Sequence, residues 1–210
     1  MEYERPNVTV DVALFALRKG RLCVLLAPRT AEPHAGVLAL PGGYVHVDED
    51  ADTEATARRV LMQKIGTAVP YVEQLYTFSG IARDPRGWSV SVAYYALLPE
   101  GSVVLPEGAL FMPVDAVEAL DPPLPFDHLA IVAKAVERLR GKSTYSGLPL
   151  FLLGREFTMR EVQAVYETVL GETLPAASFR RRVEEQGLVR ARGYMRVGKA
   201  NRPAQLYEAV

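Results

Sequence analysis

The chain of 210 residues contains a single cysteine and has no long apolar run, and both absences exclude whole classes of protein. Because Cys23 stands alone, no internal disulfide and no cysteine-rich metal site can form. Without a run of about eighteen apolar residues, no transmembrane helix is expected. The opening residues, "MEYERPNVTVDV", are acidic and polar, whereas a secretion signal is basic and then apolar. We therefore expect a cytoplasmic protein that does not contact the membrane.

Positive charge is scarce in most of the chain and concentrated near its end. The whole sequence has 24 Lys and Arg residues against 25 Asp and Glu residues. Residues 176–210 hold eight basic and three acidic side chains, which leaves 16 basic and 22 acidic ones for the rest. A basic tail on an acidic body predicts different partners for the two parts, with a polyanion for the tail. A solvated charged surface is the alternative explanation.

The first two thirds of the sequence alternate between strand patterns and helix patterns. The apolar runs "VTVDVALFAL" and "RLCVLLAPR" flank Arg18-Lys19-Gly20 and predict a β-hairpin. A helix is expected from Asp52 or Thr53 to about Ile65, with Gly66 as its C-terminal stop. A second amphipathic helix follows residue 126, and further strands are expected in "LALPGGYV", "PYVEQLYTFSG", "WSVSVAYYALLP" and "VVLPEGALFMPV". We predict an α/β or α+β domain with a mixed sheet over residues 1–142.

The last third follows a different plan. Thr158 and Glu161 form a capping-box pattern before the helix "MREVQAVYETVLG". Pro175 can occupy the first turn of a second helix, "AASFRRRVEEQG", which Gly187 is expected to stop. The segments "LVRARGYMRV" and "AQLYEAV" then read as two strands joined by "GKANRP". Two helices followed by a basic hairpin predict a small winged helix-turn-helix domain over residues 143–210.

The stretch "LPGGYVHVDEDADTEATARRVLMQKIG", residues 40–66, resembles the signature of the Nudix hydrolases. That signature reads G-x5-E-x7-R-E-U-x-E-E-x-G, with U aliphatic, and its helix carries three glutamates that bind Mg²⁺ in that family. Gly43 and Glu49 fit its first half, and Arg59 keeps the arginine if two residues are inserted before the helix. In that register the glutamate positions hold Val60, Gln63 and Lys64; without the insertion they hold Arg58, Leu61 and Met62.

Either alignment removes all three metal ligands, so we predict no catalytic residues, no metal site and no enzymatic activity. A lysine on the face of the helix where the metal would lie can instead hold a diphosphate without cleaving it. Four upstream acids precede or open the helix and are the only candidates for a rescued metal site: Glu49, Asp50, Asp52 and Glu54.

The resemblance extends over nearly the whole chain. The ordered segments "LALPGGYV", "SGIARDPRGWSVSVAYYAL", "PFDHLAIVAKAVERLRGK" and "FTMREVQAVYETVLG" are similar to those of the Nudix-related transcriptional regulators of NAD metabolism. Members of that family pair a Nudix-like ligand domain with a C-terminal winged helix. The resemblance implies a homodimeric repressor on a palindromic double-stranded operator. It also implies release from DNA when ADP-ribose or a related nucleotide binds as effector, with no cofactor.

Two groups of residues are candidates for these contacts. A glycine pair lets the backbone approach a phosphate, and basic side chains after strands can grip a diphosphate. Consecutive residues of a helix point in different directions, so at least one of three adjacent arginines must face away from DNA. The effector candidates are Arg29, Gly42, Gly43, Lys64, Arg83 and Arg86; the DNA candidates are Ser178, Arg180, Arg181, Arg182, Lys199 and Arg202.

Two other functions fit the same sequence. One is an active Nudix hydrolase of nucleoside diphosphate derivatives, whose tail only helps it to dimerise. The other is a regulator of the same architecture that responds to a sugar or to another nucleotide.

Overall fold

One strand, β1 (Asn7–Arg18), organises the first domain, and it is buried along most of its length. In a strand, successive side chains point to opposite faces of the sheet. Val10 and Val12 accordingly belong to the apolar core on one face, whereas Ala13 and Phe15 belong to the core on the other. This burial on both sides explains why "VTVDVALFAL" is an almost continuous apolar run.

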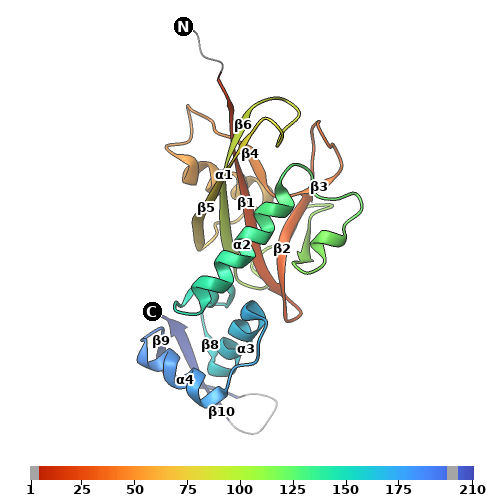
Figure 1. Cartoon of the computed structure of the whole chain (residues 1–210). Helices are drawn as coiled ribbons and strands as arrows, with labels where there is room; N and C mark the ends of the chain where they lie inside the picture. The colour runs from red at the N-terminus through yellow and green to blue at the C-terminus, as the bar shows by residue number, and fades with distance from the viewer. Residues whose placement is uncertain (1–4, 198–202) are drawn as a thin grey trace.

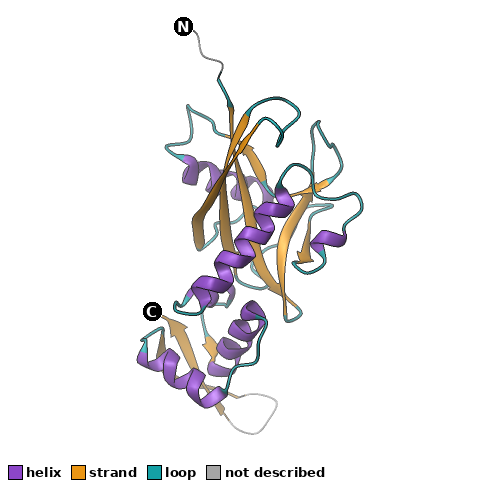
Figure 2. Ribbon diagram, in the orientation of Figure 1, coloured by secondary structure: helices purple, strands orange, loops and turns teal. Residues whose placement is uncertain are grey.

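The computed structural model describes residues 5–197 and 203–210, and its first domain contains a mixed sheet (Figures 1 and 2). The strands follow the order β3-β2-β1-β6-β5, with β4 also paired to β1 and β7 to β2. Strand β1 runs parallel to β6 and antiparallel to β2 and β4. The prediction of a mixed sheet is therefore confirmed. The other strands are β2 (Arg21–Pro28), β3 (Leu38–Ala39), β4 (Gly42–Tyr44), β5 (Tyr71–Gly80), β6 (Ser89–Leu98) and β7 (Leu110–Pro113).

The predicted β-hairpin and the predicted helix of the Nudix-like motif both form where the sequence places them. Lys19 and Gly20 have positive φ angles of 51° and 72°, as a two-residue turn between β1 and β2 requires. Helix α1 (Thr53–Ile65) begins after Asp52, whose carboxylate accepts a hydrogen bond from the Ala55 N–H, and ends at the left-handed Gly66. α1 covers one face of the sheet, and α2 (His128–Ser143) covers the other (Figure 1).

The winged helix-turn-helix prediction is also confirmed. Thr158 and Glu161 form the expected capping box at the start of α3. Strands β8, β10 and β9 form a separate small sheet in that order. The elements of this second domain are η2 (Leu148–Leu152), β8 (Phe157–Thr158), α3 (Met159–Leu170), α4 (Ala176–Glu185), β9 (Val189–Val197) and β10 (Pro203–Ala209). The short 3-10 helix η1 (Val117–Ala119) belongs to the first domain.

The two domains share part of one apolar core. Val165 and Val169 of α3 belong to the same buried cluster as Leu17 and Leu22 of the β1–β2 hairpin. Close by, the Arg140 guanidinium of α2 donates to the Val169 carbonyl at 3.1 Å. The winged helix is therefore packed directly against the sheet and α2. The expected boundary between residues 142 and 143 falls in the last turn of α2. Over the described parts of the chain, no helix has the length and apolar content needed to span a bilayer.

Candidate effector pocket and nucleic-acid interface

A cavity of about 220 Å³ opens where the chain leaves β2, enters β4 and begins α2. It also receives the last turn of α1 and the loop between β5 and β6. The structure thus brings together side chains that are more than a hundred positions apart in the sequence, such as Thr9 and His128. All six residues expected to contact an effector line this cavity: Arg29, Gly42, Gly43, Lys64, Arg83 and Arg86.

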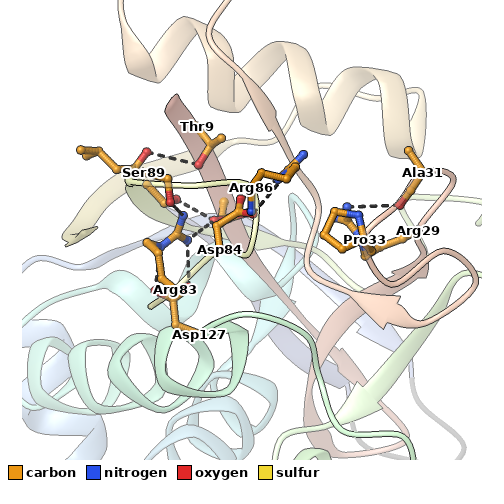
Figure 3. Close-up of polar contacts among 12 residues, drawn as sticks. Thr9, Arg29, Ala31, Pro33, Arg83, Asp84, Arg86, Ser89 and Asp127 are labelled. Carbon is orange, nitrogen blue, oxygen red and sulfur yellow. Dashed lines mark hydrogen bonds and ion pairs between the residues drawn. The ribbon is translucent and has the colours of Figure 1, made fainter. Parts of the chain in front are cut away.

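Arg29 and Lys64 bring positive charge to the cavity, and within residues 5–197 and 203–210 neither pairs with a carboxylate. The Arg29 guanidinium donates to two backbone carbonyls, at 2.8 Å to Pro33 and 3.3 Å to Ala31 (Figure 3). Partial burial, together with the nearby charge of Arg86, lowers the pKa of Arg29. Among the described residues, Lys64 makes no ion pair. An anion in the cavity would compensate both charges.

Arg86 and Arg83 differ in how completely their guanidinium groups are paired with carboxylates of the protein. Arg86 pairs with Asp84 through two contacts of 3.0 and 2.7 Å and keeps about a third of its side chain exposed. Arg83 is only 7% exposed and donates to both oxygens of Asp127 at 2.9 and 2.8 Å, as Figure 3 shows. It also contacts Asp11 at 3.3 Å. Arg83 therefore stabilises the wall of the cavity, which differs from its expected role as a grip on phosphate.

Phe126 is a cavity residue that the sequence analysis did not identify. Its ring lies 4.8 Å from the Arg29 guanidinium and 5.8 Å from that of Arg86. Its φ of +57° is uncommon for a bulky residue and is maintained by the surrounding packing. Tyr44, 43% exposed, lies at the rim of the same cavity, whereas Trp88 does not line it.

Asp127 and His128 lie at the start of the long amphipathic helix in the sequence, a place where capping or interface residues are expected, and the structure gives Asp127 no capping role. Asp127 occupies the N-cap position of α2 but makes no capping hydrogen bond, because its carboxylate binds Arg83. His128 is buried, and its Nδ1 accepts the Leu40 N–H at 3.1 Å. Its Nε2 lies 3.4 Å from Asp11, a carboxylate that the sequence analysis missed. A lone acid in the apolar run of β1 was the available signal, since buried charges need partners.

The glycine pair has a packing role in addition to its place in the cavity. Both glycines belong to β4 and pair with Asp11 and Val10 of β1. A Cβ on Gly42 would lie 2.3 Å from the Asp11 carboxylate oxygen, and one on Gly43 would lie 3.2 Å from Val60. Close contact with β1 therefore accounts for Gly42 and close contact with α1 for Gly43, and phosphate binding by their backbone stays a prediction.

The acids upstream of the motif helix already have protein partners. Asp50 has a side chain only 2% exposed and pairs with Arg59 at 2.7 Å, which holds the pKa of Asp50 well below its usual range. Thr56 donates a further hydrogen bond to the same carboxylate at 2.8 Å. The side chains of the other three also contact protein groups: Glu49 pairs with His46, Asp52 accepts from the Ala55 N–H, and Glu54 pairs with Arg58.

Helix α4 presents its three arginines in different directions, as expected. Arg181 is the most exposed, at 76% of its side chain, and lies 3.7 Å from Glu185. Arg180 pairs with Glu184 and donates to the Tyr207 hydroxyl. Arg182 is partly buried instead, with its guanidinium above the rings of Tyr166 and Phe179 at 5.9 and 5.4 Å.

Arg182 is thus the arginine that faces away, and a role in DNA contact is not expected for it. Ser178 is exposed, but its hydroxyl donates to the Pro175 carbonyl within the first turn of α4. The predicted contacts Lys199 and Arg202 lie outside the described residues.

Comparison with known proteins identifies both domains. A model of the NUDIX domain matches residues 5–135, and a model of the NrtR DNA-binding winged helix domain matches residues 149–209. The chain is 38% identical over 210 residues to the ADPR responsive transcriptional repressor NtrR of Acinetobacter baylyi, covering 98% of this chain and 83% of that protein. This chain belongs to the NrtR family.

Solved structures of NrtR from Shewanella oneidensis agree with this assignment. One, in complex with a 27mer DNA, has a TM-score of 0.90 and 39% identity, with 97% of this chain and 93% of that chain covered. Another, of the NUDIX domain in complex with ADP ribose, has a TM-score of 0.61 and 36% identity over 65% of this chain and 90% of that chain. The resemblance inferred from the sequence segments is therefore confirmed for both domains of the NrtR architecture.

Gly42→Ala is expected to lower stability and distort the cavity, because the added methyl would collide with the Asp11 carboxylate. Overpacking of this kind costs about 1–3 kcal/mol. Urea denaturation measures the change in the free energy of unfolding. Gly141→Ala is the matched control, since a Cβ there meets nothing within 4 Å in the interior of α2. Equal stabilities for Gly42→Ala and Gly141→Ala would contradict the close contact between β4 and β1.

Proposed function

We propose that this member of the NrtR family is a dimeric transcriptional repressor of NAD metabolism genes that binds a palindromic operator and responds to ADP-ribose. The observation that carries the proposal is a cavity in which Arg29 and Lys64 pair with no carboxylate of the part of the chain that the structure describes, in a chain that also bears a winged helix. The relatives support it, since one is named as ADPR responsive and another was solved with ADP ribose.

The diphosphate is the part of the effector that the cavity is best suited to hold. Guanidinium and ammonium groups form strong charge-assisted hydrogen bonds with phosphate oxygens. Arg29 and Lys64 are available for such bonds, and Arg86 can share its charge between Asp84 and a ligand. A volume of about 220 Å³ lies below the roughly 300–1,000 Å³ of most ligand pockets. The rest of ADP-ribose would extend toward the exposed Tyr44 ring at the rim.

DNA binding by a single copy would be weak, which is why we propose a dimer. One winged helix contacts few base pairs, and affinity at physiological salt depends on the number of phosphates neutralised. A two-fold dimer doubles the contacts and makes docking of the second domain intramolecular. In such a dimer, two segments are candidates for fixing the two winged-helix domains relative to each other. They are residues 126–140 and the η2 segment, which hold the winged helix on the first domain.

A hydrolase is the second candidate, because the first domain has the Nudix fold. We propose that this chain does not hydrolyse ADP-ribose, since the positions of the three motif glutamates hold Val60, Gln63 and Lys64. Val60 packs on Gly43, and Lys64 brings a positive charge to the place where the fold would hold a cation.

ADP-ribose should bind without added Mg²⁺, and Arg29→Ala or Lys64→Ala should weaken binding by about 1.5–3 kcal/mol, the value of a charge-assisted hydrogen bond. Isothermal titration calorimetry measures the change. Arg21→Ala is the control, because Arg21 is an exposed arginine paired with Asp115 outside the cavity. No binding by the wild-type chain, or undiminished binding by Arg29, Lys64, Arg83 and Arg86 variants alike, would show that the proposed pocket is wrong.

Release of AMP from ADP-ribose in the presence of Mg²⁺ should not exceed background. The reason is the absence of carboxylates at the motif positions and the engagement of the upstream acids by protein groups. Chromatographic separation of nucleotides measures the product. Robust turnover that disappears in Glu49→Gln would contradict the prediction and make the upstream acids metal ligands.

Arg181→Ala should weaken binding to a palindromic operator by about 1–3 kcal/mol if the arginine reads a base edge. If it contacts only phosphate, the loss should be similar on any sequence and the salt dependence shallower. Fluorescence anisotropy measures both, with half-sites one or two helical turns apart. Arg58→Ala, which removes the same charge from α1, is the control. Equal affinity of the wild-type chain for palindromic and random duplexes would refute the repressor proposal.

A further inference from the structure

A buried polar cluster forms the part of the effector cavity next to the first turn of α2, where Asp11, Arg83 and His128 line it. Its centre is Asp11 of β1, only 7% exposed, which accepts a 2.6 Å hydrogen bond from the Ser91 hydroxyl. Arg83 contacts Asp11 from the loop after β5 and binds Asp127 more tightly. His128 completes the cluster from α2. Burial by itself raises the pKa of Asp11, but His128, Ser91 and Arg83 together lower it, so the carboxylate is charged.

The contacts of His128 fix which of its ring nitrogens carries the proton. The Leu40 N–H points at Nδ1 from 3.1 Å, so Nδ1 must accept and cannot be protonated. The proton of the neutral ring is therefore on Nε2, which lies 3.4 Å from Asp11. An imidazole oriented by a carboxylate in this way has both its tautomer and its ring plane fixed.

The segment that His128 holds is the wall of the cavity. Leu40, Pro41, Gly42 and Gly43 all line it. The Pro41 carbonyl accepts from the Val12 N–H at 2.8 Å, so β1 fixes this segment from one side. His128 fixes it from the other through the Leu40 N–H. Among the described side chains, His128 is the one that hydrogen-bonds to this wall from α2.

Helix α2 also reaches the winged helix. His128 is its first residue, and Arg140, about 18 Å further along an ideal helix, donates to the Val169 carbonyl of α3. Between them, Ile131 and Leu139 are fully buried in the core that includes Val165 and Val169. A change in the cavity wall that moves His128 therefore has a packed path to the DNA-binding domain.

We propose that His128, oriented by Asp11, is a positioning residue that holds the Leu40–Gly43 wall in its effector-binding geometry and ties that wall to α2. The proposal rests on the function proposed above. In this proposal His128 affects effector binding through its hydrogen bond with the Leu40 N–H and not by contact with the effector.

Two variants of His128 and one control variant test the role. His128→Leu removes both ring nitrogens, His128→Asn keeps an acceptor near the position of Nδ1, and Ile131→Val is a control for mild loss of packing in the same helix. His128→Leu should raise the Kd for ADP-ribose about tenfold or more, since a buried N–H loses its acceptor. His128→Asn should recover most of the affinity, and Ile131→Val should bind as the wild type. Calorimetry gives the Kd for each variant.

Hydrogen–deuterium exchange at the Leu40 amide separates failure of this inference from failure of the proposed function. The amide should exchange slowly in the wild type, faster in His128→Leu and slowly again in His128→Asn, whether or not ADP-ribose binds. Unchanged exchange in His128→Leu would overturn the positioning role. So would wild-type affinity for ADP-ribose in His128→Leu, or an affinity in His128→Asn no better than in His128→Leu. If the wild-type chain does not bind ADP-ribose but the exchange pattern holds, the effector assignment fails and the positioning role stands.

Discussion

The carboxylate of Asp11 is a charge in the middle of the most buried strand of the protein, and much of the cavity follows from the need to compensate it. An unpaired charge in such a place costs several kcal/mol, so partners must converge on it. Arg83, Ser91 and His128 do so from three separate elements. The same carboxylate leaves no room for a side chain at Gly42. The cavity wall and the start of α2 are therefore positioned by one buried group.

Helix α1 keeps the shape of the Nudix loop and helix and carries different side chains on the face toward the cavity. Arg59 still organises the loop before the helix, because it binds Asp50 and the Tyr44 carbonyl. Val60 packs on Gly43 and Lys64 faces the cavity, where the family signature has acids. On the function proposed above, this helix brings a positive charge to a site that would bind an anion and not cleave it.

The two domains are coupled by packing and not only by a linker. Interfaces between domains are often polar and allow relative motion. Here α3 contributes Val165 and Val169 to the core beneath α2, and Arg140 satisfies a carbonyl at the end of α3. Helix α2 is consequently in contact with the cavity through its first residue and with the winged helix through its last turns. Such an arrangement suits a protein in which one domain senses and the other binds DNA.

The sequence by itself determined the elements, the two-domain plan and the cationic residues of the cavity. Periodicity, capping residues and glycine stops are local signals, and Asp52, Gly66 and the Thr158 capping box act where the chain places them. Only the tertiary structure decided which cationic side chains are neutralised by a carboxylate or buried against other side chains. Arg83 is neutralised by Asp127, 44 positions away, and Arg182 lies against buried rings, because ion pairs and burial depend on neighbours that are distant in the chain.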